Sequence, residues 1–414
     1  MENWFADLME EEVPFEDIQK RADNGEFHSW NFEPVFESQE NGYEDVTDEI
    51  KKYTAVDYLA LRDKRDAAKG DTSLVTKYQA EMDKMVDDVL AIYREKNIFP
   101  IQYYSEMGIL DEISRCIEYK AFWEGNMVSC GAGIGTSLCN FLFPNLFDTP
   151  SQHDLDKKDA RSLFEKFHND SYLRKAILFC FGYKSGCPLP TSVMGGLRLV
   201  GSAPTNFRPM NAKAVYERFC EPGGIIFDSS CGFGGRMLGC LSSKNDYKYV
   251  GCDPNTETMY HLHQLGNYIE QVTDREGSFE LHCCGSEMFK GPEESIDFAF
   301  SSPPYFDLEV YSDEPTQCYN KFPKLNDWLE GFVRMTIRNI VRMLKRGKVY
   351  AINIADFSTG GSTVAYVDEW IRISKEEGAP LFDTVYLGVT ARAGSKEQAA
   401  GELKKENILV FKKF

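Results

Sequence analysis

Apolar and polar positions follow two different periods along the chain. Before about residue 200 the apolar positions recur at steps of three and four, which is typical of amphipathic helices. The clearest case carries Val75, Tyr78, Met82, Val86, Leu90 and Tyr93. After residue 200, short apolar runs end in glycine or proline and alternate with helical patterns. The pattern predicts a mostly helical N-terminal part and a C-terminal part in which strands alternate with helices.

Seven apolar runs in the C-terminal part have the length and flanks of strands. They are GGIIFDSS, YKYVGCDPN, SFELHCCGSE, SIDFAFSSPPY, KVYAINIADF, FDTVYLGVTAR and NILVFKKF. A long helix, LNDWLEGFVRMTIRNIVRMLKRG, precedes the fifth, with Trp328, Phe332, Ile337, Ile340, Val341 and Leu344 on its apolar side. This alternation predicts an α/β fold with a doubly wound, largely parallel sheet. The last two runs lack a crossover helix and are expected to form an antiparallel hairpin at one edge.

The composition bounds the class of protein. The chain has 414 residues, of which 43% are hydrophobic, enough for a sizeable core. It has no apolar run long enough to cross a membrane, and its acidic start is unlike a signal or transit peptide. We therefore expect a cytoplasmic protein with no membrane contact. Its twelve cysteines include no CxxC pair and its six histidines no HxxxH spacing, so we expect reduced thiols and no metal.

The net charge of −19 is concentrated near the N-terminus. Residues 1–50 hold sixteen acidic and two basic residues, which leaves −5 to the rest of the chain. A block of like charge is typical of a solvated arm. The alternative is a segment that covers a basic cleft or binds a protein partner. We therefore divide the chain into this acidic segment (1–50), a mostly helical region (51–195) and the strand-rich region (196–414).

A glycine loop follows the first predicted strand. The strand ends at Asp228, and the loop contains Gly232, Phe233 and Gly234. Glycines at a strand-to-helix turn let a ligand approach the backbone closely, although turn geometry alone also explains such loops. The next strand ends at Asp253, twenty-five positions after Asp228. An acid there is placed to bind the ribose hydroxyls of an adenosine-type cofactor, or else forms an Asp-Pro turn.

The loop does not fit the common phosphate-binding motifs. The dinucleotide fingerprint requires glycine at Met237, and the sequence contains no GxxxxGK[ST] loop. An acid before the loop disfavours a pyrophosphate and suits a cofactor with a cationic amino group, such as S-adenosylmethionine (SAM). A second glycine-rich stretch, CGAGIGTSL at residues 130–138, follows no clear strand and is interpreted as a helix start or a packing point.

The fourth strand ends in Ser302, Pro303, Pro304 and Tyr305. The two prolines cannot continue a strand ladder and make a rigid corner. In a doubly wound sheet this strand lies beside the first, so the corner would face the glycine loop. Fixed oxygen acceptors there suit an exocyclic amino group, and the tyrosine ring suits stacking on a base. A plain proline-rich turn is the alternative.

These motifs resemble the SAM-dependent DNA amino-methyltransferases, which make N6-methyladenine or N4-methylcytosine. The family's catalytic motif, [DNS]-P-P-[YFW], matches Ser302 to Tyr305, and its cofactor motifs match Asp228, Gly232, Gly234 and Asp253. The stretches NFRP, GFGGR, SPPYF and YSDEPTQCY are similar to phage-encoded and bacterial putative DNA methylases, which implies a bacterial or phage-infected cell. The resemblance covers about residues 195–414 and implies a Rossmann-like, seven-stranded methyltransferase sheet.

The resemblance also implies further site residues and a partner. Asn206, Phe207 and Arg208 match the segment that packs on the methionine moiety of SAM, while Ser286 and Glu287 are expected near its adenine. The expected partner is double-stranded DNA with the target base flipped out, recognised by the N-terminal half. No Pro-Cys nucleophile follows a strand, which disfavours cytosine-C5 chemistry. The alternatives are methylation of RNA or of a protein glutamine, and a binding protein with an inactive methyltransferase fold.

Two segments beside the catalytic motif have open roles. Lys345, Arg346 and Lys348 are expected at the C-terminal end of the long helix, where they contact phosphate or the helix dipole. Residues 311–324 follow the corner. They form either a mobile loop that carries Tyr311, Gln317 and Tyr319 to the base, or an ordered surface loop.

Overall fold

The chain divides into two compact units. The computed structural model describes residues 12–28, 47–131, 133–149, 161–182, 186–200, 204–306, 310–359, 362–389 and 403–414. Unit 1 consists of Met1–His28, Glu106–Asn145 and Thr205–Phe414, and unit 2 of Ser29–Ser105 and Leu146–Pro204. This division differs from the expected boundaries at residues 50 and 195, because two stretches of the N-terminal half belong with the sheet.

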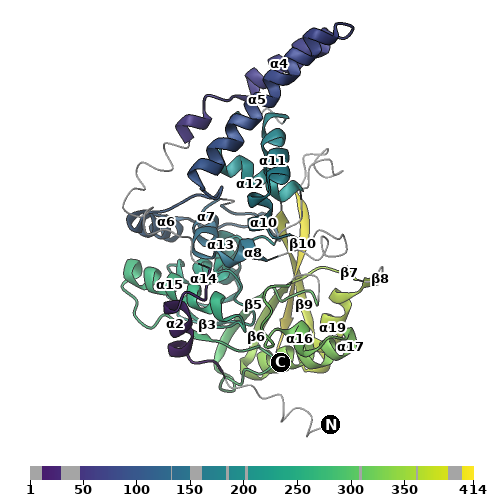
Figure 1. Cartoon of the computed structure of the whole chain (residues 1–414). Coiled ribbons are helices and arrows are strands. Elements are labelled where there is room, and N and C mark those ends of the chain that lie inside the picture. The colour runs from purple at the N-terminus through teal and green to yellow at the C-terminus, as the bar shows by residue number, and fades with distance from the viewer. Residues whose placement is uncertain are drawn as a thin grey trace. The chain divides into compact units, whose positions relative to one another are not determined.

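Unit 1 is built on one eight-stranded sheet in the order β1-β9-β10-β6-β5-β2-β3-β4 (Figure 1). The strands are β1 (Met127–Val128), β2 (Ile225–Asp228), β3 (Lys248–Cys252), β4 (Phe279–His282), β5 (Ile296–Ser301), β6 (Leu344–Asn353), β9 (Leu381–Val389) and β10 (Lys404–Lys412). All neighbours pair in parallel except β10, which is antiparallel to both β9 and β6. The predicted α/β, doubly wound class is confirmed. The seven predicted strands are all present, and β1 is an eighth that no apolar run announced.

The last two strands form the predicted antiparallel pair, but the predicted edge position is wrong. Strand β10 lies inside the sheet, between β9 and β6, and the short β1 forms the edge. Residues 408–411 of β10 are fully or almost fully buried. A continuous apolar run of this kind is typical of a strand covered on both faces. A separate two-stranded ribbon, β7 (Phe357–Thr359) with β8 (Ser362–Val364), follows β6.

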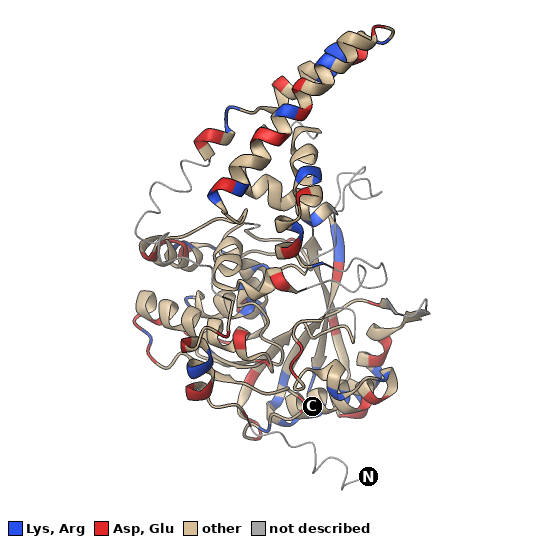
Figure 2. Cartoon of the chain, viewed as in Figure 1, with Lys and Arg blue, Asp and Glu red and all other residues tan. Residues whose placement is uncertain are grey.

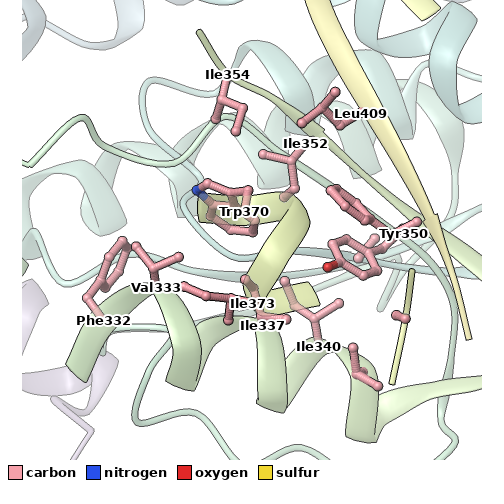
Figure 3. Close-up of a cluster of buried hydrophobic side chains, with 14 of the residues drawn as sticks. Phe332, Val333, Ile337, Ile340, Tyr350, Ile352, Ile354, Trp370, Ile373 and Leu409 are labelled. Carbon is pink, nitrogen blue, oxygen red and sulfur yellow. The ribbon is translucent and has the colours of Figure 1, made fainter. Parts of the chain in front are cut away.

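Helices cover both faces of the sheet. On one face α17 (Leu325–Trp328), the π-helical turn η1 (Leu329–Arg334), α18 (Met335–Met343) and α19 (Tyr366–Glu376) enclose a large core. Figure 3 shows Phe332, Ile337, Ile340, Trp370 and Ile373 from these helices against Tyr350 and Ile352 of β6. Each such buried side chain contributes about 1.5–3 kcal/mol. The predicted apolar side of the long helix is therefore confirmed.

The long helix ends earlier than its sequence pattern predicted. Strand β6 begins at Leu344, so Lys345, Arg346 and Lys348 lie on a strand and not at a helix C-terminus. Leu344 pairs with Ile296, the first residue of β5. These cations therefore lie at the opposite end of β5 from the Ser302–Tyr305 corner, and Lys345 forms an ion pair with Asp297 at 2.8 Å. The predicted position at a helix C-terminus is therefore wrong, whereas a contact of these cations with phosphate stays a prediction.

The other face of the sheet is covered by helices from the start of the strand-rich region. They are α13 (Pro209–Phe219), α14 (Gly235–Leu241) and α15 (Thr256–Thr273); unit 1 also contains α6 (Glu106–Glu118), α7 (Thr136–Leu142) and α16 (Cys318–Lys321). Tyr216 of α13 packs edge-on against Phe298 and Phe300 of β5. Ala299, between them, belongs to the core on the opposite face. This alternation is the period of a strand buried on both sides.

Residues 12–28 pack on unit 1. Their helix α2 (Phe15–Asp23) places Phe15 against His263 of α15, with ring centroids 3.8 Å apart. The backbone N–H of Val13 donates to the carbonyl of Cys283, just beyond β4. For this stretch the solvated-arm interpretation is wrong, because aromatic contacts hold it in place. Residues 1–11 and 29–46 of the acidic segment lie outside the described residues.

Unit 2 is helical in its described residues, as predicted. It contains α4 (Ala55–Ala67), α5 (Thr72–Lys96), α10 (Leu163–His168), α11 (Asp170–Gly182) and α12 (Pro190–Val200), while α8 (Asn145–Asp148) begins at the last residue of a unit 1 stretch. Asp71 caps α5 by accepting from the N–H groups of Ser73 and Leu74. Met82, Val86 and Tyr93 of the predicted apolar stripe are buried.

Candidate active site

Three predicted motifs meet at the carboxyl edge of the sheet. Strand β2 lies between β5 and β3, and all three run parallel. The chain passes from β2 outward to β3 and β4 and then returns to β5 on the other side of β2. This reversal is a topological switch point, where ligands bind in open α/β sheets. Asp228, Asp253 and Ser302 stand at the carboxyl ends of these strands, as predicted.

Asp228 is fully buried, and both carboxylate oxygens are occupied. Arg236 of α14 donates from Nε to Oδ2 at 2.8 Å, and Tyr249 also donates to Oδ2. Ser301 of β5 and the backbone N–H of Ser230 donate to Oδ1. The cation that this carboxylate contacts here is Arg236, and the expected contact with a cationic cofactor group stays a prediction. Asp228 ties the glycine loop to the ends of β3 and β5.

The glycines of the loop have different roles. Gly232 has φ +56°, and a Cβ built there would meet no atom closer than 4.0 Å. Gly234 has φ +76°, and its Cβ would lie 2.6 Å from Phe143 and 2.7 Å from Leu265. Only glycine accommodates both the left-handed backbone and the close contact at position 234. Gly232 therefore leaves space for a ligand, whereas Gly234 allows α14 to pack tightly.

Asp253 is hydrogen-bonded to the loop and keeps accepting capacity. Its Oδ2 accepts from the N–H of Gly232 at 2.9 Å, and its Oδ1 accepts from the N–H of Asn255 at 3.1 Å. Burial raises its pKa to about 6, although the two backbone N–H groups oppose this shift. Each carboxylate oxygen can accept a second hydrogen bond. This geometry combines the predicted turn with an acceptor pair suited to two neighbouring hydroxyl groups.

The segment before α13 borders the glycine loop, as the resemblance implied. Asn206 donates from Nδ2 to the carbonyl of Phe233 at 2.8 Å. The Phe207 ring lies edge-on to Phe300 of β5, and the Arg236 guanidinium lies 5.7 Å from its centroid. Arg208 is the N-cap residue of α13 and is half-buried. The structure thus gathers these predicted residues on one side of the loop.

The Ser302–Tyr305 corner is held by β6 and α19. Ser302 donates from Oγ to the carbonyl of Asn353 at 3.2 Å, and the Tyr366 hydroxyl donates to the carbonyl of Pro304 at 3.1 Å. The backbone N–H of Ala355 donates to the Tyr305 hydroxyl. Pro303 is buried. Each part of the corner therefore has a fixed orientation before any substrate arrives.

The next residue carries backbone strain. Phe306 has φ +49°, a left-handed conformation that is rare for a bulky side chain. Its ring is buried against Trp328, with centroids 5.5 Å apart. Strain of this kind persists only where the surrounding packing enforces it and is concentrated at functional sites. It marks the point where the chain leaves the corner.

Glu287, predicted near the cofactor, forms a buried ion pair. Its Oε1 accepts from Nζ of Lys321 at 3.1 Å, and both side chains are almost fully buried. Asn339 of α18 donates to the carbonyls of Ser286 and Glu287, while the Ser286 hydroxyl bonds to Thr336. The pair connects the loop after β4 to the end of the segment that follows the corner. Sequence patterns gave no sign of Lys321 or Arg236 as partners.

Residues 310–321, here called the covering segment, lie along the ends of β2 and β3. The Tyr311 ring lies beside the Phe233 ring of the glycine loop, with the ring centroids 6.2 Å apart. Thr316 donates from Oγ1 to the carbonyl of Pro254 at 3.1 Å. Glu314 bonds to Thr256 and also to Arg21 of α2. Of the two predicted alternatives, the contacts fit an ordered segment, in which the Tyr319 hydroxyl bonds back to Ser312.

Among the described residues, two examples illustrate buried polar atoms at this edge that have no hydrogen-bond partner. They are Oγ of Ser229, at the start of the glycine loop, and Nε2 of Gln317, in the covering segment. Leaving such an atom unpaired costs about 1–3 kcal/mol. Unpaired buried atoms in the glycine loop and in the covering segment fit a site that receives a polar ligand. With Asp253, they fit the nucleoside and amino-acid parts of an adenosyl cofactor.

Charge is mixed over the described parts of both units. Figure 2 shows Lys and Arg interspersed with Asp and Glu along the helices. Among the residues the structure describes, no group of His, Cys, Asp and Glu is placed to hold a metal ion. No helix within these ranges is long and apolar enough to span a membrane.

Comparisons with known proteins return likenesses in structure only. No protein-family model matches the chain, and no curated protein matches it. A TehB-like SAM-dependent methyltransferase from Corynebacterium glutamicum is 15% identical over 52% of this chain and 94% of that chain, with a TM-score of 0.30. A geranyl diphosphate methyltransferase in complex with GPP and sinefungin is 12% identical over 54% of this chain and 82% of that chain, with a TM-score of 0.35.

A likeness of the same degree is found to a cyclase. The cyclase SpnF is 14% identical to this chain over 50% of it and 81% of that chain, with a TM-score of 0.34. At these identities and TM-scores the likenesses carry no functional argument, because one fold serves many chemistries. Function has to be argued from the site.

Proposed function

We propose that this chain is a SAM-dependent methyltransferase that acts on the exocyclic amino group of adenine or cytosine in DNA. One observation carries the proposal: the Ser302–Tyr305 corner, the open glycine loop and Asp253 stand together at the switch point of the sheet. The corner alone is a rigid turn, and the loop alone is a common strand-to-helix connection. Together they supply an acceptor set beside a nucleoside site.

The cofactor is held by residues that can still form hydrogen bonds. When bound, SAM supplies an electrophilic methyl group on a sulfonium. Asp253 accepts hydrogen bonds from the ribose hydroxyls, and Gly232 admits the cofactor close to the backbone. Ser229 offers its hydroxyl to the amino-acid end. Asp228 acts indirectly, since its bonds to Arg236 and Ser301 hold the loop and the corner in register.

The substrate side uses the corner. The Ser302 hydroxyl donates a hydrogen bond to the carbonyl of Asn353. The lone pairs of the hydroxyl oxygen therefore remain to accept a hydrogen bond from an amino group. The carbonyl of Pro303 is the second acceptor. Hydrogen bonds from both N–H groups to these acceptors shift lone-pair density onto the amino nitrogen, which is otherwise a poor nucleophile when conjugated to a ring. As the nitrogen takes the methyl group from the sulfonium, it releases one of its two protons to solvent. Tyr305, oriented by Ala355, stacks on the base. Preorganised acceptors of this kind stabilise the charge that develops during transfer.

A protein glutamine amide is the second candidate substrate. It presents the same conjugated NH2 group to the same corner. The net charge of −19 and the interspersed basic residues favour a substrate without a phosphate backbone. RNA as a substrate would need the same positively charged surface as DNA. The methyl-transfer assay described next distinguishes the two nucleic acids.

The test is transfer of labelled methyl from SAM to unmodified DNA, to RNA and to protein, followed by digestion and identification of the product by mass. Methylated adenine or N4-methylcytosine in DNA is the expected product. Ser302→Ala should lose activity while SAM affinity is retained. Ser295→Ala, at the other end of β5, is the matched control, because its hydroxyl donates to the nearby carbonyl of Pro292. Tight SAM binding with no nucleic-acid product would overturn the DNA assignment and favour the glutamine substrate if protein is labelled.

A further inference from the structure

Gln317 has a buried side chain with an unused hydrogen-bond donor. Only 5% of the residue is exposed, and its Nε2 finds no partner among the described residues. Its backbone groups are satisfied, because its N–H donates to the carbonyl of Glu314 and its own carbonyl accepts from Asn320 and Lys321. The Nε2 donor is therefore the part of Gln317 that the described residues leave without a hydrogen bond. A buried, unpaired amide destabilises a protein unless a ligand completes it.

The neighbours of Gln317 fix its place at the nucleoside side of the site. Thr316, one residue before, bonds to the carbonyl of Pro254, which directly follows Asp253. Cys318, one residue after, is buried. Burial raises the pKa of its thiol, and the negative charge of Glu287 raises that pKa further. Lys321, four residues after Gln317, forms the ion pair with Glu287. Gln317 thus lies between the loop that ends β3 and the loop that follows β4, and the corner stands on the other side of β2.

We propose that Nε2 of Gln317 donates a hydrogen bond to the nucleoside part of the cofactor, at a purine ring nitrogen or a ribose oxygen. The inference rests on the proposed SAM site and adds a specificity residue from the covering segment, outside the glycine loop and the Asp253 turn. The neutral amide donor of Gln317 suits these neutral acceptors. A carboxylate or a phosphate group is more strongly bound by a cationic side chain such as Arg. The charges nearest Gln317 are already paired, as Lys321 with Glu287 shows.

The test uses Gln317→Met, which removes the donor at similar volume. Affinity is measured by calorimetry for SAM and, separately, for adenosine, and the melting temperature is measured without ligand. We expect both affinities to fall by the same factor, about tenfold for one hydrogen bond. We also expect the ligand-free melting temperature to stay the same or rise, because an unpaired polar group has been removed. Gln317→Glu, which lacks the donor when ionised, should show the same loss of affinity.

The outcomes separate this inference from the proposed function. Asp313→Asn, an exposed change in the same segment, is the control and should leave both affinities unchanged. Unchanged adenosine affinity in Gln317→Met, with wild-type protein binding normally, would overturn this inference alone. A fall in affinity together with a lower ligand-free melting temperature would assign Gln317 a structural role and also overturn it. If wild-type protein bound neither SAM nor adenosine, the proposed function itself would fail.

Discussion

At the scale of single residues, the role proposed for Asp253 predicts that cofactor binding depends on pH. Burial raises its pKa to about 6 in the ligand-free protein. The ionised form accepts the ribose hydroxyls, so affinity for SAM is full above pH 7 and falls as pH drops through 6. The carboxylate contact is worth about 1.5–3 kcal/mol. Asp253→Asn should therefore weaken binding by about ten- to a hundredfold at pH 8 and abolish the pH dependence between 5 and 8.

The control for that titration is the stability of the ligand-free protein, which responds in the opposite direction. A carboxyl group whose pKa is raised on folding contributes most below its unfolded value near 4, and this contribution is lost as pH rises through about 6. Wild type should therefore lose stability relative to Asp253→Asn over that window. Binding by Asp253→Asn that still fell with acidity would assign the titration to another group.

Asp228 and Arg236 form a pair whose separation is costly. Both side chains are almost fully buried, and their closest atoms are 2.8 Å apart. Arg236→Leu leaves the carboxylate buried without its cation, which costs about 3–5 kcal/mol. Urea denaturation should show this loss, and the double variant Asp228→Asn, Arg236→Leu should recover part of it. A single Asp228→Asn variant that kept full stability but lost SAM affinity would instead restore the direct cationic contact predicted from the sequence.

The sequence predicted the positions of the site residues at strand ends, but it did not predict the side chains with which they pair. Asp228, Asp253 and Ser302 were recognisable because each ends a strand, and strand ends of a parallel sheet share one edge. Arg236 and Lys321 pair with acids eight and thirty-four positions away in the chain, and no local periodicity encodes such pairs. The orphan atoms of Ser229 and Gln317 are likewise visible only when all neighbours are placed.

At the scale of elements, strands with long apolar runs were predictable, and their order was predictable in part, since the fourth predicted strand lies beside the first as expected. The hairpin of β9 and β10 was expected at one edge, yet the short β1 pairs outside β9 and forms that edge. β1 has two residues and forms only because β9 offers a free edge. The transition from α18 to β6 at Leu344 was missed, since the apolar and basic residues there fit either a helix end or a strand start.

Helix α2 should support the site through one ion pair. Arg21 contacts Glu314 at 3.2 Å and Thr256 at 2.7 Å, and so joins residues 12–28 to the covering segment. Arg21→Ala should lower SAM affinity about threefold to fivefold, since partly exposed pairs are worth up to about 1 kcal/mol. Lys20→Ala is the matched control, because the ion pair of Lys20 is with Asp17 of the same helix. Equal affinities for the two variants would show that α2 does not act on the site.

At the scale of the whole molecule, unit 1 contains every residue assigned to cofactor and methyl transfer. Unit 2 contributes none of them, and we propose for it the target recognition that the sequence resemblance implied for the N-terminal half. The proposed DNA substrate would meet the field of a protein of net charge −19, so that a few exposed cations would decide phosphate contact. Lys64 of α4 and Lys77 of α5 are exposed cations of this kind.

Reversing these two charges tests the assignment of unit 2. Lys64→Glu with Lys77→Glu should weaken DNA binding at least tenfold at low salt and flatten the slope of log affinity against log salt by about 2, because each lost phosphate contact removes about 0.9. SAM affinity should not change, which separates recognition from cofactor binding. Arg346→Glu, an exposed charge reversal at the far end of β5 from the corner, should leave the slope as it is. A slope altered by Arg346→Glu and not by the unit 2 pair would place the DNA on unit 1 instead.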